Sequence, residues 1–164
     1  MNIGIRKALP SDAAIMASLL NEIIERGGTT AYETPFSAEM MQTTYIASPN
    51  LISCVVAEDR SDLLGFQGLF APEADDPLPS DWGLIATFTD VRSTGRGIGR
   101  ALFASTTEAA SKAGIRTIDA KIRADNESGL AYYGRLGFWD YDRIVGVPLK
   151  NGALVDRVRK RFDL

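Results

Sequence analysis

The sequence contains no histidine, only one cysteine and no long hydrophobic run, and each absence excludes a class of function. Without histidine, Ser-His-Asp catalysis, Cys-His catalysis and histidine-ligated metal sites are excluded. The single cysteine, Cys54, cannot form a disulfide within the chain or a multi-cysteine zinc site, and its place in the apolar run 51–57 predicts a core residue. No apolar stretch approaches the roughly 20 residues of a membrane span, and the N-terminal residues lack a signal-peptide core. We therefore expect a cytoplasmic protein without membrane contact.

Acidic residues outnumber basic ones, with 21 Asp and Glu against 18 Lys and Arg, so the formal net charge is −3. An acidic chain is a poor candidate for general nucleic-acid binding. The only basic run contains Arg157, Arg159, Lys160 and Arg161. We interpret it as charges that protect an edge strand from aggregation, with a dimer contact or an anion site as alternatives. With 164 residues, 45% of them hydrophobic, the chain is expected to form one domain over 1–164.

Hydrophobic periodicity and turn signals predict the element order β-α-α-β-β-β-α-β-α-β-β. The expected strands are 3–9, 51–58, 63–71, 82–90, 116–123, 138–148 and 153–162, and the expected helices are 12–26, 37–47, 98–113 and 127–136. The expected inner face of the third helix is Ile98, Leu102, Ala109 and Ala113. Asn151-Gly152 predicts a two-residue hairpin turn between the last two strands. This mixed order predicts an α/β or α+β sheet covered by helices.

A glycine-rich turn, Thr94 to Arg100, lies between an expected strand and an expected helix. Glycines let the backbone approach a ligand closely, and the free N–H groups of a helix start attract anions. The turn therefore predicts a phosphate cradle, with Arg96 and Arg100 adding positive charge, although a tight turn without a ligand is the alternative. No Gly-Lys pair supports a P-loop, and the Gly-x-Gly-x-Gly spacing in mid-chain does not fit a nicotinamide fingerprint.

Two motifs at matching separation resemble the GNAT acetyltransferase family. Its cofactor signature is Arg/Gln-x-x-Gly-x-Gly/Ala, and Gly97 and Gly99 fill the two small positions. The family then carries an asparagine, a tyrosine seven residues later and a basic-Leu-Gly-Phe ending, which match Asn126, Tyr133 and 135–138. This resemblance covers essentially the whole chain and implies a single domain with a mixed, largely antiparallel central sheet flanked by helices.

The resemblance also implies a cosubstrate, acetyl-CoA, and no metal. By analogy, the pyrophosphate lies on the backbone of the glycine turn, the pantetheine arm lies along the preceding strand, and an asparagine side chain bonds the arm. The residues so implied are Gly95, Arg96, Gly97, Ile98, Gly99 and Arg100, then Thr87, Phe88 and Thr89, and Asn126. The segments 5–8 and 29–33 resemble the phosphinothricin-acetyltransferase subgroup, which acetylates small amino-acid-like amines and is often dimeric.

Tyr133 is the expected catalytic residue. An amine attacks the thioester carbonyl, and a tyrosine with a pKa near 10 is protonated at neutral pH, so it can donate to the leaving thiolate. Direct transfer in a ternary complex is expected, because the chain has no histidine or well-placed cysteine for a covalent relay. The alternative role for Tyr133 is a half-buried aromatic residue that packs on the sheet, and its neighbour Tyr132 is expected to face elsewhere on the helix.

The sequence departs from the family pattern at two points. Thr94 occupies the leading Arg/Gln position, and the strand before the turn has no carboxylate to serve as the base. Glu33, Asp90 and Asp81 are candidate bases, with a chain of water molecules as the alternative, and Glu33 can instead bind the amino group of the substrate. The expected function is N-acetylation of a small primary amine, such as an amino acid or analogue, and the resemblance to the subgroup implies a homodimer. A silent acyl-CoA-binding module and an acetyltransferase of a protein N-terminus or lysine are the alternatives.

Overall fold

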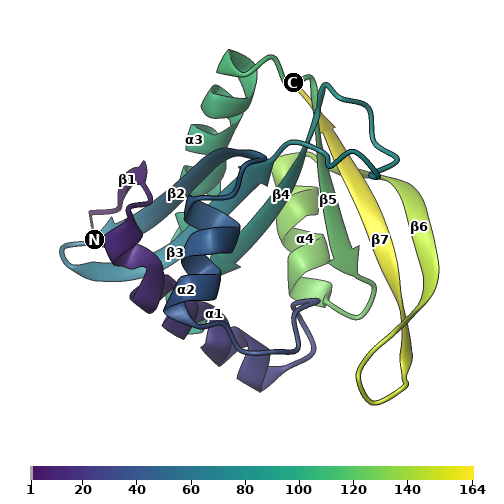
Figure 1. Ribbon diagram of the computed structural model, residues 1–164, viewed down its shortest axis with the longest axis horizontal. Helices are drawn as coiled ribbons and strands as arrows, with labels where there is room; N and C mark the ends of the chain where they lie inside the picture. The colour runs from purple at the N-terminus through teal and green to yellow at the C-terminus, as the bar shows by residue number, and fades with distance from the viewer. Residues whose placement is uncertain (1) are drawn as a thin grey trace.

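The computed structural model describes residues 2–164, and within them the strands form a seven-stranded sheet in the order β1-β2-β3-β4-β5-β7-β6 (Figure 1). The strands are β1 (Gly4–Lys7), β2 (Leu51–Asp59), β3 (Asp62–Phe70), β4 (Trp82–Thr89), β5 (Thr117–Arg123), β6 (Trp139–Pro148) and β7 (Leu154–Asp163). The helices are α1 (Ala13–Arg26), α2 (Ala38–Met41), α3 (Ile98–Lys112) and α4 (Glu127–Leu136), with short helical turns η1 (Pro10–Asp12), η2 (Gln42–Ile46) and η3 (Val91–Ser93). The expected order of strands and helices is confirmed, and the ends differ by only a few residues.

The middle of the sheet opens between β4 and β5. These two strands are parallel and pair only from Trp82 to Leu84 with Thr117 to Asp119. Beyond that point β4 stays paired with β3, and β5 stays paired with β7, but the two strands spread apart (Figure 1). Each strand therefore has an edge toward the gap whose backbone groups lack a partner strand, and such groups need another hydrogen-bonding partner.

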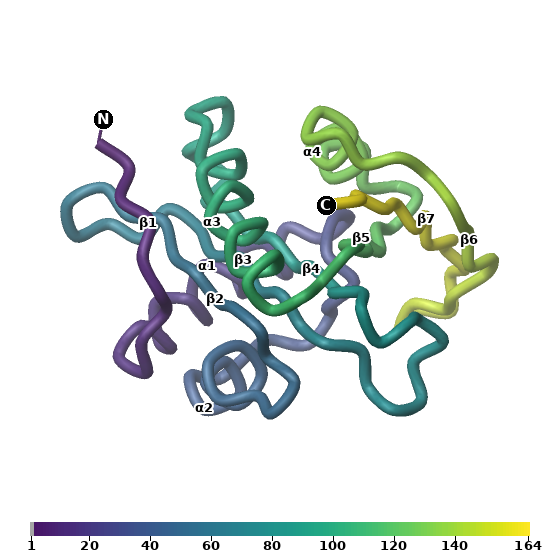
Figure 2. The backbone as a smooth tube through the Cα atoms, turned by 90° about the horizontal axis from the view of Figure 1, so that it is seen from above, coloured from purple at the N-terminus to yellow at the C-terminus, as the bar shows by residue number. Residues whose placement is uncertain are grey.

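Helices cover both faces of the sheet, as the view from above shows (Figure 2). On one face, α1 and α2 bury a core that contains Met16, Leu20, Met41 and Phe66. On the other face, α3 and α4 cover a second core that contains Phe103, Ile118, Tyr133 and Phe138. Burial of these apolar side chains stabilises the layers by roughly 1.5–3 kcal/mol for each large residue. Of the helices within residues 2–164, none is long and apolar enough to cross a membrane.

Cys54 lies in the first core with 4% of its surface exposed, so the expectation of a core cysteine is confirmed. Burial raises the pKa of its thiol to about 12. The thiol is therefore protonated at neutral pH and is a poor nucleophile.

The expected inner face of α3 was partly wrong. Ile98 and Leu102 are buried, but Ala109 is only partly buried and Ala113 is exposed. The buried face continues instead through Phe103, Thr106 and Ala110. A period of 3.6 residues leads from Leu102 to Thr106 and Ala110, and the polar Thr106 obscured that face in the sequence.

The basic run near the C-terminus does not lie on an edge strand, so that interpretation was wrong. β7 lies between β5 and β6, and β6 forms the edge. Arg157 and Arg159 are 6% exposed. The hairpin pattern predicts that β6 and β7 pair, but it does not say which of the two lies next to β5.

The last hairpin forms as expected, but its turn is longer than two residues. The N–H of Gly152 donates to the carbonyl of Leu149 at 2.9 Å, and Ala153 accepts from Leu149 N–H at 2.8 Å. Lys150 and Asn151 are thus the central residues, and Gly152 takes the left-handed conformation with φ of 85°. A three-residue hairpin loop with glycine in the left-handed conformation matches the twist of the strands as well as a two-residue turn does.

Candidate active site

The glycine turn presents free backbone donors at the start of α3. Gly95 and Gly97 have φ of 80° and 77°, and a Cβ atom at either position would meet nothing within 4 Å. The first bond inside the helix runs from Ala101 N–H to the Gly97 carbonyl at 3.0 Å, so the N–H groups of Ile98, Gly99 and Arg100 have no helical acceptor. Open space beside free donors at a helix N-terminus is suited to an anion such as phosphate.

The side chains of the turn are arranged unequally. Arg96 donates to Ser93 Oγ at 3.2 Å and lies 3.6 Å from Asp59, which holds its guanidinium beside the turn. Arg100 is exposed, and no ion pair with it occurs within residues 2–164. Thr94 donates through its hydroxyl to the carbonyl of Val91 at 3.1 Å. The threonine therefore closes the preceding turn, and the positive charge near the backbone donors comes from the two arginines.

A chain of hydrogen bonds links β3, β4 and α4 beneath the turn. Gln67 is fully buried, and its Nε2 donates to Thr87 Oγ1 at 2.9 Å and to Tyr132 Oη at 3.2 Å. Tyr132 Oη donates to the carbonyl of Gly99 at 2.8 Å. Thr87 Oγ1 lies 2.9 Å from Tyr133 Oη. The expected catalytic tyrosine is thus held in a polar chain and not only packed against the sheet.

Tyr132 leaves the helix toward Gly99 but belongs to the same hydrogen-bond chain as Tyr133, so the expectation that it lies apart from the site was wrong. Its ring lies 4.8 Å from the ring of Tyr133, and it ties α4 to the glycine turn. A Cβ atom on Gly99 would collide with the Tyr132 ring, so this glycine is required for the contact. In the sequence, Tyr132 could not be distinguished from the other apolar residues of α4. No signal in the sequence pointed to Gln67.

Burial sets the protonation of both tyrosines. It raises the pKa of Tyr132 to about 12, and it raises the pKa of Tyr133 further above the ordinary value. Thr87 acts in the opposite direction on Tyr133, because a donated hydrogen bond stabilises the phenolate. Both hydroxyls are therefore protonated at neutral pH, so Tyr133 can donate a proton or a hydrogen bond but is not available as a base.

The residues expected beside the cofactor arm lie along the gap. Thr87, Phe88 and Thr89 belong to the part of β4 that has no partner on the β5 side. Phe88 points into the core under α1, whereas Thr87 points toward α4. Asn126 is the N-cap of α4, and its Oδ1 accepts from Gly129 N–H at 2.9 Å. Capping uses the oxygen of this amide, and its Nδ2 has no acceptor within residues 2–164.

The candidate bases lie apart from one another. Glu33 accepts from Lys150 N–H with both oxygens, at 3.1 and 3.3 Å, so it joins the loop 27–36 to the β6–β7 turn. Asp90 follows β4 and caps η3 by accepting from the N–H of Arg92 at 3.0 Å. Asp81 precedes β4, at the end where β4 and β5 still pair. Only Glu33 and Asp90 lie at the open end of the gap.

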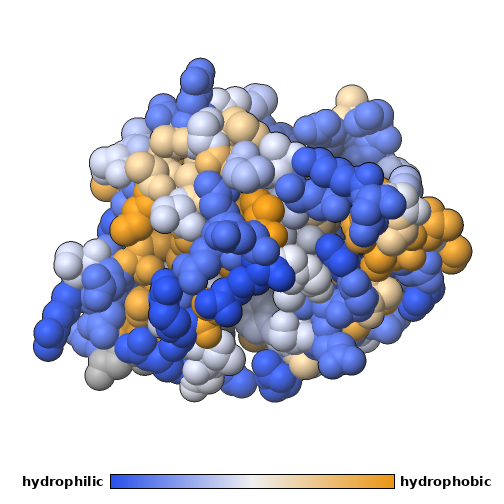
Figure 3. Space-filling model, turned by 90° about the horizontal axis from the view of Figure 1, so that it is seen from below, coloured by the Kyte–Doolittle hydropathy of each residue, from blue (hydrophilic) through white to orange (hydrophobic). Residues whose placement is uncertain are grey.

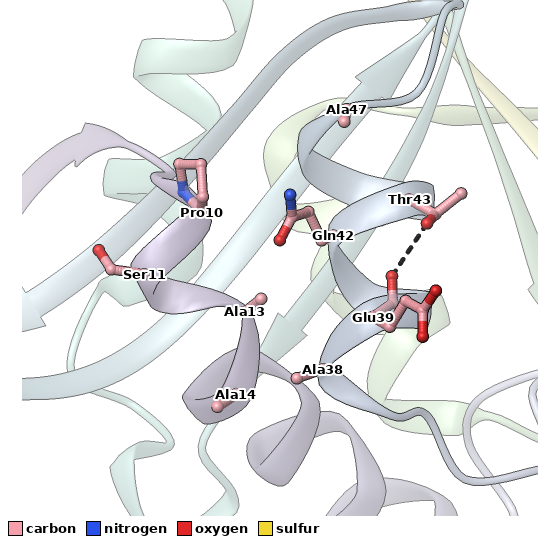
Figure 4. Close-up of a pocket in the computed structure, with 9 residues that line it drawn as sticks. All are labelled: Pro10, Ser11, Ala13, Ala14, Ala38, Glu39, Gln42, Thr43 and Ala47. Carbon is pink, nitrogen blue, oxygen red and sulfur yellow. Dashed lines mark hydrogen bonds between the residues drawn. The ribbon is translucent and has the colours of Figure 1, made fainter.

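A hollow of about 540 Å³ lies between α1 and α2 (Figure 4). Its lining residues are Pro10, Ser11, Ala13, Ala14, Ala38, Glu39, Gln42, Thr43 and Ala47. Most of these are small, and Glu39 is the only ionisable one. The hollow faces away from α3 and α4, so it does not belong to the site at the gap. In the part of the chain from residue 2 to 164, no group of three or more metal-ligating side chains is found.

Known structures share this fold. The acetyltransferase yncA of Salmonella typhimurium, solved with its cofactor acetyl-CoA, superimposes with a TM-score of 0.85 at 18% identity, over 99% of this chain and 94% of that chain. A phosphinothricin acetyltransferase of Sinorhizobium meliloti, in complex with acetyl-CoA, has a TM-score of 0.85 at 23% identity, over 100% and 89%. The ribosomal-protein-alanine N-acetyltransferase of Brucella melitensis has a TM-score of 0.81 at 21% identity, over 98% and 99%.

The sequence itself decides the family. A comparison with curated proteins finds no match. The profile of the Acetyltransferase (GNAT) family, however, matches residues 18–138, which is most of the chain. The matched range includes the open strand β4, the glycine turn, and α4 with both tyrosines. The chain therefore belongs to the GNAT acetyltransferase family.

Proposed function

We propose that this protein is an N-acetyltransferase that moves the acetyl group of acetyl-CoA directly to a small primary amine. The observation that carries the proposal is the placement of three features around one gap in the sheet. These are the free donors of the glycine turn, the unpaired edge of β4, and the buried hydroxyl of Tyr133. Membership of the GNAT family supports it, as do the structural neighbours solved with acetyl-CoA.

The residues around the gap fit acetyl-CoA. Gly95 and Gly97 leave open space where side chains would stand, so a pyrophosphate can reach the backbone donors. The edge of β4 from Ile85 to Thr89 offers peptide groups to the amides of a pantetheine arm. Asn126 keeps its Nδ2 available to the same arm. When bound, acetyl-CoA supplies a thioester whose carbonyl carbon accepts the amine.

Tyr133 is proposed as the proton donor. In the transfer a C–N bond forms, the C–S bond breaks, the amine loses a proton and the thiolate gains one. Because Gln67 donates to Thr87 Oγ1, the hydroxyl hydrogen of Thr87 is free to point to Tyr133 Oη. The hydrogen of Tyr133 is then free to be donated to the leaving sulfur. A backbone N–H on the open edge of β4 would stabilise the oxyanion.

The amine proton has two proposed routes. Asp90 lies at the open end of β4, although its carboxylate caps η3 and pairs with Arg92 at 3.1 Å. A water chain that leads out of the gap is the second route. Glu33 keeps free lone pairs beside the Lys150 N–H, so it is proposed to hold the amino group of the acceptor.

The test is thiol release from acetyl-CoA over a panel of amino acids, phosphinothricin, polyamines, aminoglycosides and peptide N-termini. We expect release with one class of small amines, and a Tyr133→Phe variant with kcat lower by about 100-fold or more and little change in the KM for acetyl-CoA. Binding of acetyl-CoA without release for any amine would favour a silent acyl-CoA-binding module. Release with peptides alone would favour acetylation of a protein N-terminus or lysine.

We further propose a cytoplasmic homodimer that resembles the phosphinothricin-acetyltransferase subgroup. The edge formed by β6 and β7 exposes Ile144, Val145 and Leu154, at 36%, 77% and 69% of their surface. Hydrophobic residues are visible at this right-hand edge in the view from below (Figure 3). A molecular mass in solution equal to that of a single chain, measured at micromolar protein concentration, would contradict the dimer.

A further inference from the structure

Arg157 is a buried cation without a carboxylate partner. It lies in the interior strand β7 with 6% of its surface exposed. One terminal nitrogen donates to the carbonyls of Val155 and Asp156, at 3.0 and 3.5 Å, and both belong to the same strand. Within residues 2–164, no carboxylate lies within ion-pair distance of Arg157, whereas Arg159 makes two bonds to Asp119, at 3.0 and 2.9 Å. A buried charge that lacks a partner is costly and is usually associated with function.

A second arginine lies beside it. Arg123 of β5 is the direct cross-strand partner of Arg157, so both side chains leave the same face of the sheet. Arg123 is 8% exposed, binds Asp125 at 2.9 and 2.7 Å, and donates to the Thr30 carbonyl at 3.3 Å. Burial lowers the pKa of Arg157, and the neighbouring Arg123 lowers it further. The two like charges therefore attract an anion more strongly than either does alone.

The two acids near the pair are bonded to groups other than Arg157. Asp125 is held by Arg123, and Glu33 raises the pKa of both arginines from a distance while it accepts from Lys150 N–H. Neither carboxylate therefore comes within ion-pair distance of Arg157, whose acceptors among the described residues are backbone carbonyls. Among the described residues, the fully buried side-chain polar atoms without a hydrogen-bond partner belong to Gln67 and Thr106. The nitrogens of Arg157 that donate to no group are not among them, so they retain some exposure and stay open to a ligand.

The pair lies at the open end of the gap. Trp82 is opposite Thr117, so a continued register would set Arg123 opposite Phe88, but the two strands have separated there. The loop 27–36 bridges them, because Thr30 accepts from Arg123 while the Tyr32 ring lies 6.1 Å from the Phe88 ring. Figure 1 shows this connection rising toward the lower end of α4, where β5 ends.

We propose that Arg157, together with Arg123, binds the carboxylate of the acceptor, so that the substrate class is a small aminocarboxylate. This inference rests on the proposed function, because it assumes that the amine enters the gap from the face of loop 27–36. A carboxylate accepts two hydrogen bonds from one guanidinium, which also orients the rest of the molecule. With the carboxylate on Arg157, the amino group lies within the region between Glu33 and the opening of β4. Polyamines and aminoglycosides, which carry only positive charge, are excluded by the same pair.

The experiment compares each amino acid that supports thiol release with its own carboxamide, which keeps the amine and lacks the anion. Rates are taken over a range of pH, since the amide lowers the pKa of the neighbouring amine. We expect kcat/KM for the carboxylate to exceed that for the amide by about 10- to 100-fold, the value of a charge-assisted hydrogen bond. Arg157→Met should remove this preference through KM, with kcat and the rate on the amide nearly unchanged.

Two variants control for charge and for folding. Lys121→Met removes an exposed cation from the same face of β5, two residues before Arg123, and should leave the preference intact. Arg157→Lys keeps a charge but loses the two-bond geometry, so it should retain only part of the preference. Removal of an unpartnered buried charge should not lower the midpoint of thermal unfolding, and a fall as large as that of Arg159→Met would assign Arg157 a structural role and overturn the proposal.

The result for the site can be separated from the result for the activity. Thiol release with equal kcat/KM for carboxylates and amides overturns the anion site and leaves the proposed function intact. If no amine supports release, thermal unfolding with added amino acids decides the question. A rise in the midpoint for the wild type but not for Arg157→Met supports the anion site without the activity, and no rise in either overturns it.

Discussion

Replacement of Arg159 by methionine should remove a large part of the stability of this protein. The Asp119 side chain is 1% exposed and that of Arg159 is 7% exposed, and two hydrogen bonds join them across β5 and β7. Tyr141 also donates to Asp119 Oδ1. After the substitution the carboxylate stays buried with one donor from a side chain, and its charge is no longer compensated.

The magnitude follows from this geometry. Loss of one partner of a buried ion pair costs about 3–5 kcal/mol. In a chain of 164 residues, about 1 kcal/mol shifts the midpoint of thermal unfolding by roughly 2–4 °C. We therefore expect Arg159→Met to unfold roughly 6–20 °C below the wild type. The double variant Asp119→Leu, Arg159→Met removes both charges and should recover most of the loss, because the Tyr141 hydroxyl is partly exposed and can bond to water.

The assay is circular dichroism during heating, combined with urea titration for the free energy of unfolding. Arg143→Met is the matched control, because Arg143 is 55% exposed and pairs with Asp156 at the surface. This control should cost less than about 1 kcal/mol. If Arg159→Met costs no more than Arg143→Met, or if the double variant is less stable than the single one, the reasoning about the buried charge is refuted.

Three further outcomes test other parts of the structure. Thr87→Val removes the hydroxyl that orients Tyr133, so kcat should fall by about tenfold or more, and the loss of the acceptor for buried Gln67 should cost about 1–3 kcal/mol of stability; an unchanged kcat in the folded variant would contradict the proposed direction of the chain. Gly97→Ala forces a side chain into φ of 77°, which costs about 1–2 kcal/mol, and it fills the open space, so calorimetry should show weaker binding of acetyl-CoA. Arg6 lowers the pKa of Asp12, so the roughly 1 kcal/mol by which Asp12→Asn is destabilised should be present above the unfolded pKa of about 3.9 and disappear as pH falls through the lower folded value.

Elements with strong local signals were predictable. Asn126 and Gly137 bound α4 as a side-chain cap and a left-handed glycine, and the helix ends where these residues stand in the sequence. The glycine turn was predictable for the same reason, because positive φ and free N–H groups depend on adjacent residues. The burial of Tyr133 also agrees with the motif, although its partner Thr87 was expected only to contribute its backbone.

The long-range contacts of the site were not predictable. Gln67 bonds to Tyr132 across 65 positions, and Arg123 bonds to Thr30 across 93. A polar residue within a strand pattern predicts a solvent-facing position. Only the packing of α4 on β3 buries Gln67 and makes it a donor inside the protein. Tyr132 was misjudged for a similar reason. Neighbouring residues of a helix point about 100° apart, and only the tertiary packing of α4 places polar partners in both directions.

The sequence by itself determined the order of strands and helices, the glycine-rich turn before α3 and the family, because periodicity, caps and glycine spacing act over a few residues. The tertiary structure alone decided which cations are buried. β7 inserts between β5 and β6, and the alternation of its side chains then sets Arg159 on Asp119 and Arg157 beside Arg123. The order of strands in a sheet depends on the packing of distant segments, so four basic residues that look alike in the sequence have different environments in the fold.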